Sequence, residues 1–152
     1  MNLNNELNKD IKLTILIAED NDTLRRSLYD LFHTYYTGSH ILEAKDGEEA
    51  VSLALAIKPD IILMDIKMPR INGLYATRRI KEVLPDVRVV IITVHENPEY
   101  KIDAAAAGVS AYVIKHNIIK ALRNVMVSLL SHPEERDKLK LYSNMYARGF
   151  LL

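Results

Sequence analysis

Three carboxylates in this chain follow two short apolar runs, at positions where a strand would end. Residues 13–18 (LTILIA) lead into Glu19 and Asp20, and residues 61–64 (IILM) lead into Asp65. Because the carboxyl ends of parallel strands meet at one edge of a sheet, we expect the three acids to lie close together. Several carboxylates, completed by water, make a hard oxygen site that suits Mg²⁺, and without a cation they would raise each other's pKa. The spacing therefore predicts a Mg²⁺ site.

A hydroxyl and an ammonium group follow two later apolar runs. Thr93 ends the run 88–93, and Lys115 comes directly after the run 111–114. Asp65 is then the candidate nucleophile, because a carboxylate can attack phosphorus and form an acyl phosphate. Such a transfer depends on positioning and on neutralising the charge of the phosphoryl oxygens. A cation, the Lys115 ammonium and the Thr93 hydroxyl could supply both.

The elements that must position these groups alternate along the chain. Apolar runs and helical patterns follow each other from about residue 12 to residue 130, which is typical of repeated βα units around a parallel sheet. Strands are expected at 12–18, 40–44, 61–65, 88–93 and 111–114. Five helices are expected between and after them: one opening at 21–23, one from 46 until Pro59 closes it, and others at 72–84, 97–107 and 118–130. This pattern predicts an α/β fold with a doubly wound sheet.

The chain is expected to divide into a polar tail (1–11), one domain (12–130) and an amphipathic tail (131–152). A chain of 152 residues can bury one proper core but hardly two. Residues 131–134 are typical of a capping box, and the apolar positions that follow predict a short sixth helix. That helix would expose more apolar surface than an isolated one should, so we expect it to pack on its own domain or on a second copy.

The composition excludes several classes of protein. The chain is 49% apolar and 26% charged, as in an ordinary soluble globule, and no apolar stretch approaches the roughly 20 residues of a membrane span. Its 20 basic and 20 acidic residues cancel, so the overall field favours neither nucleic acid nor a membrane. Cysteine is absent, which excludes disulfides and thiolate metal sites and fits a cytoplasmic location.

The motifs, taken in order, resemble those of response-regulator receiver domains of two-component signalling, the family that includes the chemotaxis receivers. The matching segments are 19–20, 65–69 with 72–73, 90–93, and 107–115. The resemblance covers about residues 12–130. It implies a flavodoxin-like parallel sheet in the order 2-1-3-4-5 between five helices. It also implies a signalling phosphoacceptor, which is no enzyme but assists its own Mg²⁺-dependent phosphorylation and dephosphorylation.

The resemblance further implies a role for each motif residue. Asp65 would accept a phosphoryl group from a histidine kinase. Mg²⁺ would be held by Asp20, Asp65 and the backbone carbonyl of Lys67, with Glu19 helping through water. The phosphoryl group would be bound by Thr93 and paired with Lys115, and Tyr112 would turn inward on activation.

Two positions depart from the usual family pattern, and two others should lie beside the phosphoryl group. His116 follows Lys115 where the family often has a cis proline, and because a cis non-proline bond costs about 3 kcal/mol, that bond is either trans or strained. Val94 is bulkier than the usual small residue and would narrow access to the phosphoryl group. Lys67 and His95 should flank that group. Our hypothesis is that they shield it from water and slow its loss.

The output of such a receiver is less determined by the sequence. The 22 residues after Leu130 are too few for the three-helix DNA-binding module that commonly follows receivers, so we expect no direct DNA binding. The signal would then pass to a protein partner or to a homodimer. It would pass through the tail or through the face formed by the fourth helix (97–107), the fifth strand (111–114) and the fifth helix (118–130). The alternative is the receiver portion of a truncated DNA-binding transcriptional regulator.

Two rival functions and a plainer interpretation stay open. Phosphatases with an Asp nucleophile carry a second Asp two places later, where this chain has Lys67. A receiver-shaped binding module that takes no phosphate is the other rival. In the plain interpretation the acids are solvated loop residues, Lys115 is a surface lysine and Tyr112 is half-buried strand packing.

Overall fold

Five parallel strands form one sheet in this computed structural model, which describes residues 12–131. The strand order is β2-β1-β3-β4-β5, as the family resemblance implied. The strands are β1 (Thr14–Ala18), β2 (His40–Ala44), β3 (Ile61–Asp65), β4 (Arg88–Thr93) and β5 (Ala111–Ile114). Four of the five have the expected bounds, and β1 begins two residues later than expected.

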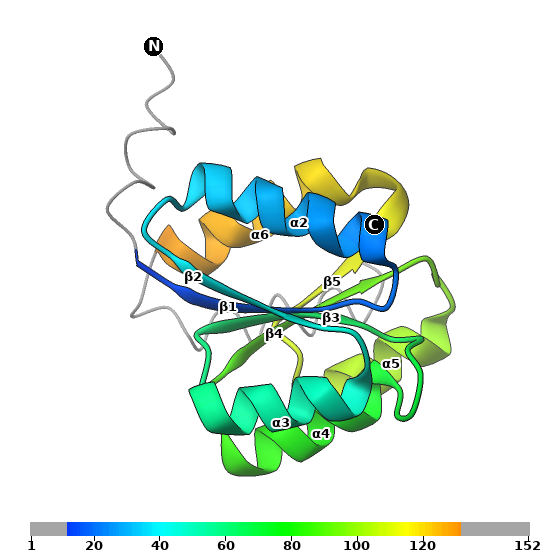
Figure 1. The fold of residues 1–152 in the computed structure, drawn as a ribbon. Coiled ribbons are helices and arrows are strands. Elements are labelled where there is room, and N and C mark those ends of the chain that lie inside the picture. Colours follow the sequence, from blue (N-terminus) through cyan, green and yellow to red (C-terminus); the bar gives the residue numbers. More distant parts are fainter. Residues whose placement is uncertain (1–11, 132–152) are drawn as a thin grey trace.

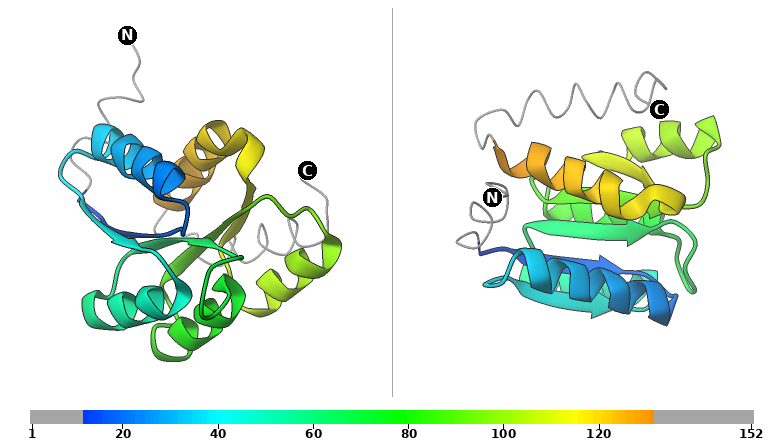
Figure 2. Two further views of the ribbon diagram at one scale, coloured as in Figure 1. Left: turned by 45° about the vertical axis from the view of Figure 1, so that its right-hand side comes forward. Right: turned by 90° about the horizontal axis from the view of Figure 1, so that it is seen from above.

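Helices cover both faces of the sheet (Figure 1). They are α2 (Asp22–Tyr35), α3 (Gly47–Ile57), α4 (Gly73–Val83), α5 (Pro98–Ala106) and α6 (Ile118–Ser131), with the short 3₁₀ helix η1 (Lys115–Asn117) before α6. One face is covered by α2 and α6, and the other by α3, α4 and α5, as the two further views in Figure 2 also show. The doubly wound α/β architecture is therefore confirmed.

Three of the predicted helix starts have N-cap side chains in the structure. The side-chain oxygens of Asn21, Asp46 and Asn72 accept hydrogen bonds from backbone N–H groups three residues later, at the starts of α2, α3 and α4. Each bond satisfies a donor that the first turn of a helix leaves without a partner. These caps fix where each helix leaves the loop that follows a strand.

The sheet separates two layers of apolar core. One layer includes Leu16, Ile62 and Ile91 with α3 and α4, and the other includes Ile17, Leu63 and the buried faces of α2 and α6. Every residue of β3 is buried, as expected for a central parallel strand covered on both faces. Asp65 therefore ends the most enclosed strand of the molecule.

The strand register brings the ends of β1, β3, β4 and β5 together. Ala18 pairs with Met64, Asp65 with Ile92, and Thr93 with Ile114. The residues just beyond these pairs therefore emerge at one edge, which Figure 1 shows at its right-hand side. Among residues 12–131, no helix is long and apolar enough to cross a membrane. The predicted sixth helix lies outside the described residues.

Candidate functional site

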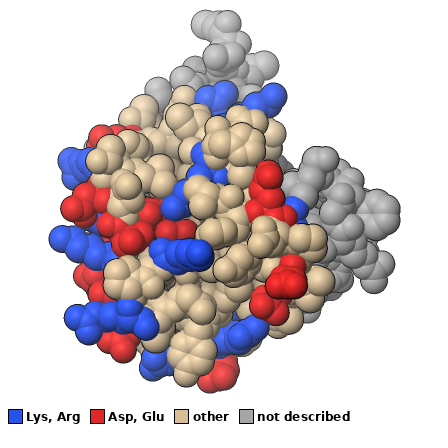
Figure 3. Space-filling model, turned by 90° about the vertical axis from the view of Figure 1, so that its right-hand side faces the viewer, with Lys and Arg blue, Asp and Glu red and all other residues tan. Residues whose placement is uncertain are grey.

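The carboxylates of Glu19, Asp20 and Asp65 meet at the carboxyl edge of the sheet. One oxygen from each lies within 4.8 Å of the others. Glu19 and Asp65 are buried, whereas Asp20 is exposed. The two carboxylates that follow β1 and the one that ends β3 are thus brought together as the spacing predicted. Figure 3, which looks at this edge, shows acidic side chains interspersed with lysines and arginines.

Lys115 joins two of these carboxylates from the end of β5. Its Nζ lies 2.7 Å from Glu19 Oε2 and 3.2 Å from Asp65 Oδ2. Burial lowers the pKa of Lys115, but the hydrogen bonds and negative charges of Glu19 and Asp65 outweigh it, so the pKa is raised. The ammonium therefore stays charged and neutralises one of the three carboxylates.

The environment of Asp65 opposes its ionisation. Burial, followed by the charge of Glu19, raises the pKa of Asp65 to about 6, although the charge of Lys115 acts in the opposite direction. A carboxylate with such a pKa is ionised at neutral pH at a cost in free energy. The site is therefore negative beyond what its own lysine compensates.

The donor set fits a divalent cation. Three carboxylates face one ammonium, and that ammonium is shared between Glu19 Oε2 and Asp65 Oδ2. Mg²⁺ takes oxygen ligands and keeps several bound waters. Because Asp20 is exposed, solvent can reach this side of the cluster. The cluster could thus hold Mg²⁺ next to Asp65.

Thr93 and Tyr112 are linked through the residue that follows Val94. The backbone N–H of His95 donates to Thr93 Oγ1 over 3.2 Å, and the hydroxyl of Tyr112 donates to the His95 carbonyl over 2.8 Å. Tyr112 is buried, and burial, followed by the charge of Tyr100, raises its pKa to about 12. Its side chain therefore already points inward in this structure.

The remaining predicted positions lie around this edge with different exposure. Lys67 and Val94 are exposed, and the ring centroid of half-buried His95 lies 5.1 Å from that of Tyr100. No peptide bond in the described residues is cis, so the bond between Lys115 and His116 is trans. The structure thus decides the alternative that the sequence left open at that bond.

A glycine lets α4 approach the end of β3 closely. A Cβ on Gly73 would lie 1.9 Å from the Asp65 carbonyl oxygen, and the Gly73 N–H donates to the Ile66 carbonyl over 2.8 Å. No larger residue fits this contact without moving backbone atoms. Gly73 therefore sets the position of the chain that carries Asp65.

Arg25 is a residue that the sequence reasoning missed. Its side chain is buried and donates from Nη1 to the carbonyl of Glu19 over 2.8 Å. A signal was present, since Arg25 occupies the buried stripe of its helix, three and seven residues before Leu28 and Phe32. A charged residue on such a stripe must find partners, and here one partner is the Glu19 carbonyl in the loop after β1.

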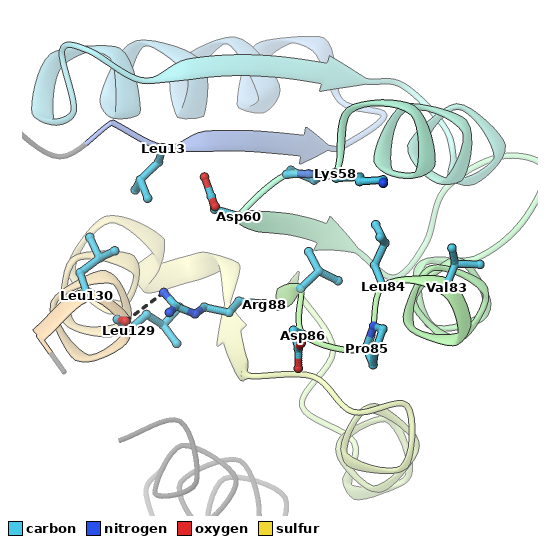
Figure 4. A pocket seen from close by; sticks show the side chains of 12 residues that line it. Leu13, Lys58, Asp60, Val83, Leu84, Pro85, Asp86, Arg88, Leu129 and Leu130 are labelled. Atoms are coloured by element: carbon cyan, nitrogen blue, oxygen red, sulfur yellow. Dashed lines mark hydrogen bonds between the residues drawn. The ribbon is translucent and has the colours of Figure 1, made fainter. Parts of the chain in front are cut away.

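A cavity in the described structure lies away from these groups. It is a hollow of about 590 Å³ at the opposite edge of the sheet, shown in Figure 4, between the start of β3, the end of α6 and the loop after α4. Lys58, Asp60 and Arg88 line it together with apolar side chains. It contains none of the predicted site residues.

Comparison with known proteins identifies the family. The model of the response regulator receiver domain matches residues 15–127. The transcriptional regulatory protein DegU of Brevibacillus brevis is 32% identical over 120 residues, which are 79% of this chain and 50% of DegU. The chain thus spans about half the length of the curated relatives it matches.

Solved structures agree with this match. A two-component response regulator of the LuxR family from Aurantimonas sp. is 25% identical, with a TM-score of 0.73 over 89% of this chain and 99% of that one. The chemotaxis protein CheY4 of Vibrio cholerae is 21% identical, with a TM-score of 0.67 over 76% of this chain and 99% of that one, which shows the shared fold. The chain belongs to the response regulator receiver domain family of two-component systems.

Proposed function

We propose that this chain is a phosphoacceptor that takes a phosphoryl group onto Asp65 from a histidine kinase. A carboxylate oxygen of Asp65 attacks phosphorus, the bond from phosphorus to the kinase imidazole nitrogen breaks, and that nitrogen keeps the electron pair. The observation that carries the proposal is the position of Lys115, whose ammonium lies between Glu19 and Asp65.

The neighbours of Asp65 have separate tasks in this reaction. Lys115, which already contacts Asp65 Oδ2, pairs with the incoming phosphoryl oxygens, and the buried Thr93 hydroxyl donates to one of them. Asp20, Asp65 and the Lys67 carbonyl would hold Mg²⁺, with Glu19 helping through water. When bound there, Mg²⁺ neutralises charge on the phosphoryl oxygens. Hydrolysis of the acyl phosphate uses the same groups, so the domain assists its own dephosphorylation.

The signal leaves the site through Thr93 and Tyr112. A phosphoryl group that draws the Thr93 hydroxyl away ends its hydrogen bond with the His95 N–H. Because Tyr112 holds the carbonyl of the same residue, the loop after β4 and the end of β5 respond together. The surface formed by α5, β5 and α6 changes as a result.

Intact mass spectrometry tests the chemistry. The wild-type protein is incubated with acetyl phosphate and Mg²⁺, and we expect the mass to rise by one phosphoryl group. Asp65→Asn and a chelator should each abolish the increase. An unmodified wild type, or a modified Asp65→Asn variant, would contradict the proposal and favour a binding module that takes no phosphate.

The output has two candidates. The curated relative DegU is a transcriptional regulatory protein of which this chain spans about half, which favours a receiver derived from a DNA-binding regulator. The balanced charge of the chain favours action through a protein partner or a homodimer instead. A gel-shift assay with the phosphorylated protein tests for direct DNA binding. Retardation of DNA would support the first candidate, whereas a shift in mass on phosphorylation without retardation would support a homodimer.

A further inference from the structure

Arg25 is a buried cation outside the set of residues that we propose to contact the phosphoryl group. Its side chain is 7% exposed and lies on the face of α2 that also buries Leu28 and Phe32. A charge in such a place costs several kcal/mol unless it is paired and hydrogen-bonded. The contacts that Arg25 makes therefore indicate its role.

The guanidinium group contacts three segments at once. Nη1 donates to the Glu19 carbonyl over 2.8 Å, in the loop after β1. Nη2 donates to the Asp22 carboxylate in the first turn of α2. Nε lies 3.3 Å from Glu43 Oε1 on β2. The carboxylates of Asp22 and Glu43 thus compensate the positive charge of Arg25. Its hydrogen bond to the Glu19 carbonyl is therefore not needed for charge balance, and its effect is to orient the backbone of the loop after β1.

The bond to the Glu19 carbonyl fixes the peptide that leads into Asp20. The backbone N–H of Glu19 is held as well as its carbonyl, because the N–H donates to the Ala44 carbonyl over 3.1 Å. Glu19 Oε1 also accepts from the Asn21 N–H over 3.1 Å. Since a peptide unit is planar, holding the Glu19 carbonyl sets the direction in which the chain continues into Asp20. The exposed Asp20 carboxylate gains its orientation from this peptide.

We propose that Arg25 is a positioning residue for the cation site. It holds the peptide between Glu19 and Asp20 so that their carboxylates converge with that of Asp65. The proposal rests on the proposed function, because the cation concerned is the one that assists phosphoryl transfer. Arg25 itself contacts neither the cation nor the phosphoryl group.

The geometry requires arginine at this position. A planar guanidinium can contact a carbonyl and two carboxylates in fixed directions, whereas a lysine ammonium is a single point of charge on a flexible stem. Arg25→Lys therefore keeps the charge and removes the fork. It separates a role in positioning from a role in charge balance.

The test measures Mg²⁺ affinity of the unphosphorylated, metal-free protein by calorimetric titration. We expect Arg25→Lys and Arg25→Met both to weaken Mg²⁺ binding by about tenfold or more, the usual effect of losing a group that orients metal ligands. Arg26→Lys is the matched control on the same helix, because its side chain is 66% exposed and pairs only loosely with Asp30 at 3.6 Å. That variant should bind Mg²⁺ as the wild type does.

A second control removes the effect of lost stability. Leu28→Ala truncates a buried neighbour on the same face of α2, so it should lower the unfolding temperature without changing Mg²⁺ affinity. The proposal is overturned if Arg25→Lys binds Mg²⁺ normally, or if Leu28→Ala weakens binding as much. Asp20→Asn distinguishes failure of the proposed cation site from failure of the role of Arg25. If Asp20→Asn also binds Mg²⁺ normally, the cation site itself is wrong, and the proposal for Arg25 falls with it. If Asp20→Asn weakens binding while Arg25→Lys does not, only the role of Arg25 is refuted.

Discussion

The carboxylate of Asp65 is held in a place that opposes its charge. It is buried, it faces Glu19, and only part of this penalty is offset by Lys115 at 3.2 Å. A phosphoacceptor benefits from this arrangement, because the carboxylate gains more from a cation or a phosphoryl group than a solvated one would. The same arrangement makes the unphosphorylated domain less stable than its fold allows.

Replacing Asp65 by asparagine should therefore stabilise the metal-free protein at pH 7. The folded pKa of about 6 lies above the ordinary value of 3.8, so between these values the folded state holds a proton that the unfolded state releases. Stability then falls as the pH rises through this window, and it stays reduced above pH 6. We expect a gain on the order of 1 to 2 kcal/mol for Asp65→Asn at pH 7, shrinking towards pH 4. Thermal unfolding at both pH values measures it, and a variant less stable than wild type at pH 7 would contradict the prediction.

The lifetime of the acyl phosphate is expected to depend on Lys67 and His95. Lys67 is exposed two residues after Asp65, and His95 is half-buried with its ring beside Tyr100. Both side chains can shield the phosphoryl group from water, so Lys67→Ala and His95→Ala should each lose it severalfold faster than wild type. Following the phosphorylated protein over time by mass spectrometry measures the rates. Equal or slower loss in both variants would refute the shielding hypothesis.

At the scale of the elements, tight packing positions Asp65 from its backbone side. The start of α4 lies so close to the end of β3 that a Cβ on Gly73 would lie 1.9 Å from the Asp65 carbonyl oxygen. A helix and a strand that touch in this way cannot move independently. The position of Asp65 is therefore set by α4 as well as by its neighbours in the sheet.

Gly73→Ala should destabilise the domain by about 3 kcal/mol, because the atoms in the way are backbone atoms that cannot rotate aside. Gly38→Ala is the matched control, since its added Cβ would meet only the flexible Lys12 side chain, at 3.2 Å. That variant should stay within about 1 kcal/mol of wild type. Chemical denaturation of the two variants checks this, and equal losses would show that the contact at Gly73 is not what limits substitution.

The sequence predicted the elements better than it predicted the contacts between them. Apolar runs and the caps at Asn21, Asp46 and Asn72 placed the strands and three helix starts, because these signals are local. The rule that the carboxyl ends of parallel strands share one edge also predicted that the three carboxylates would lie close together. The fork of Arg25 and the bridge of Lys115 to Glu19 could not be predicted, because both depend on which side chains face each other after the helices have packed.

At the scale of the whole molecule, the two edges of the sheet have different characters. The edge where the strands end carries the acidic cluster, while the opposite edge carries the cavity between β3, α4 and α6. Between them lies the surface of α5, β5 and α6, to which we propose that Thr93 and Tyr112 pass the signal. That surface exposes Ile102 and Ile119, at 59% and 57%. Exposed apolar side chains next to the proposed switch favour association as its readout.

Activation should therefore shift the protein from monomer to dimer through this surface. Beryllofluoride with Mg²⁺ imitates the phosphoryl group on a carboxylate, and size-exclusion chromatography with light scattering measures the mass before and after its addition.

We expect Ile102→Glu and Ile119→Glu to block the shift, because each would bury a charge without a partner in the interface. Val83→Glu is the control, since Val83 is equally exposed, at 61%, but ends α4 beside the cavity at the far edge. If wild type and all three variants keep one mass, activation does not drive dimerisation. If Val83→Glu alone blocks the shift, the dimer forms at the far edge, and the path through Thr93 and Tyr112 is not what drives it.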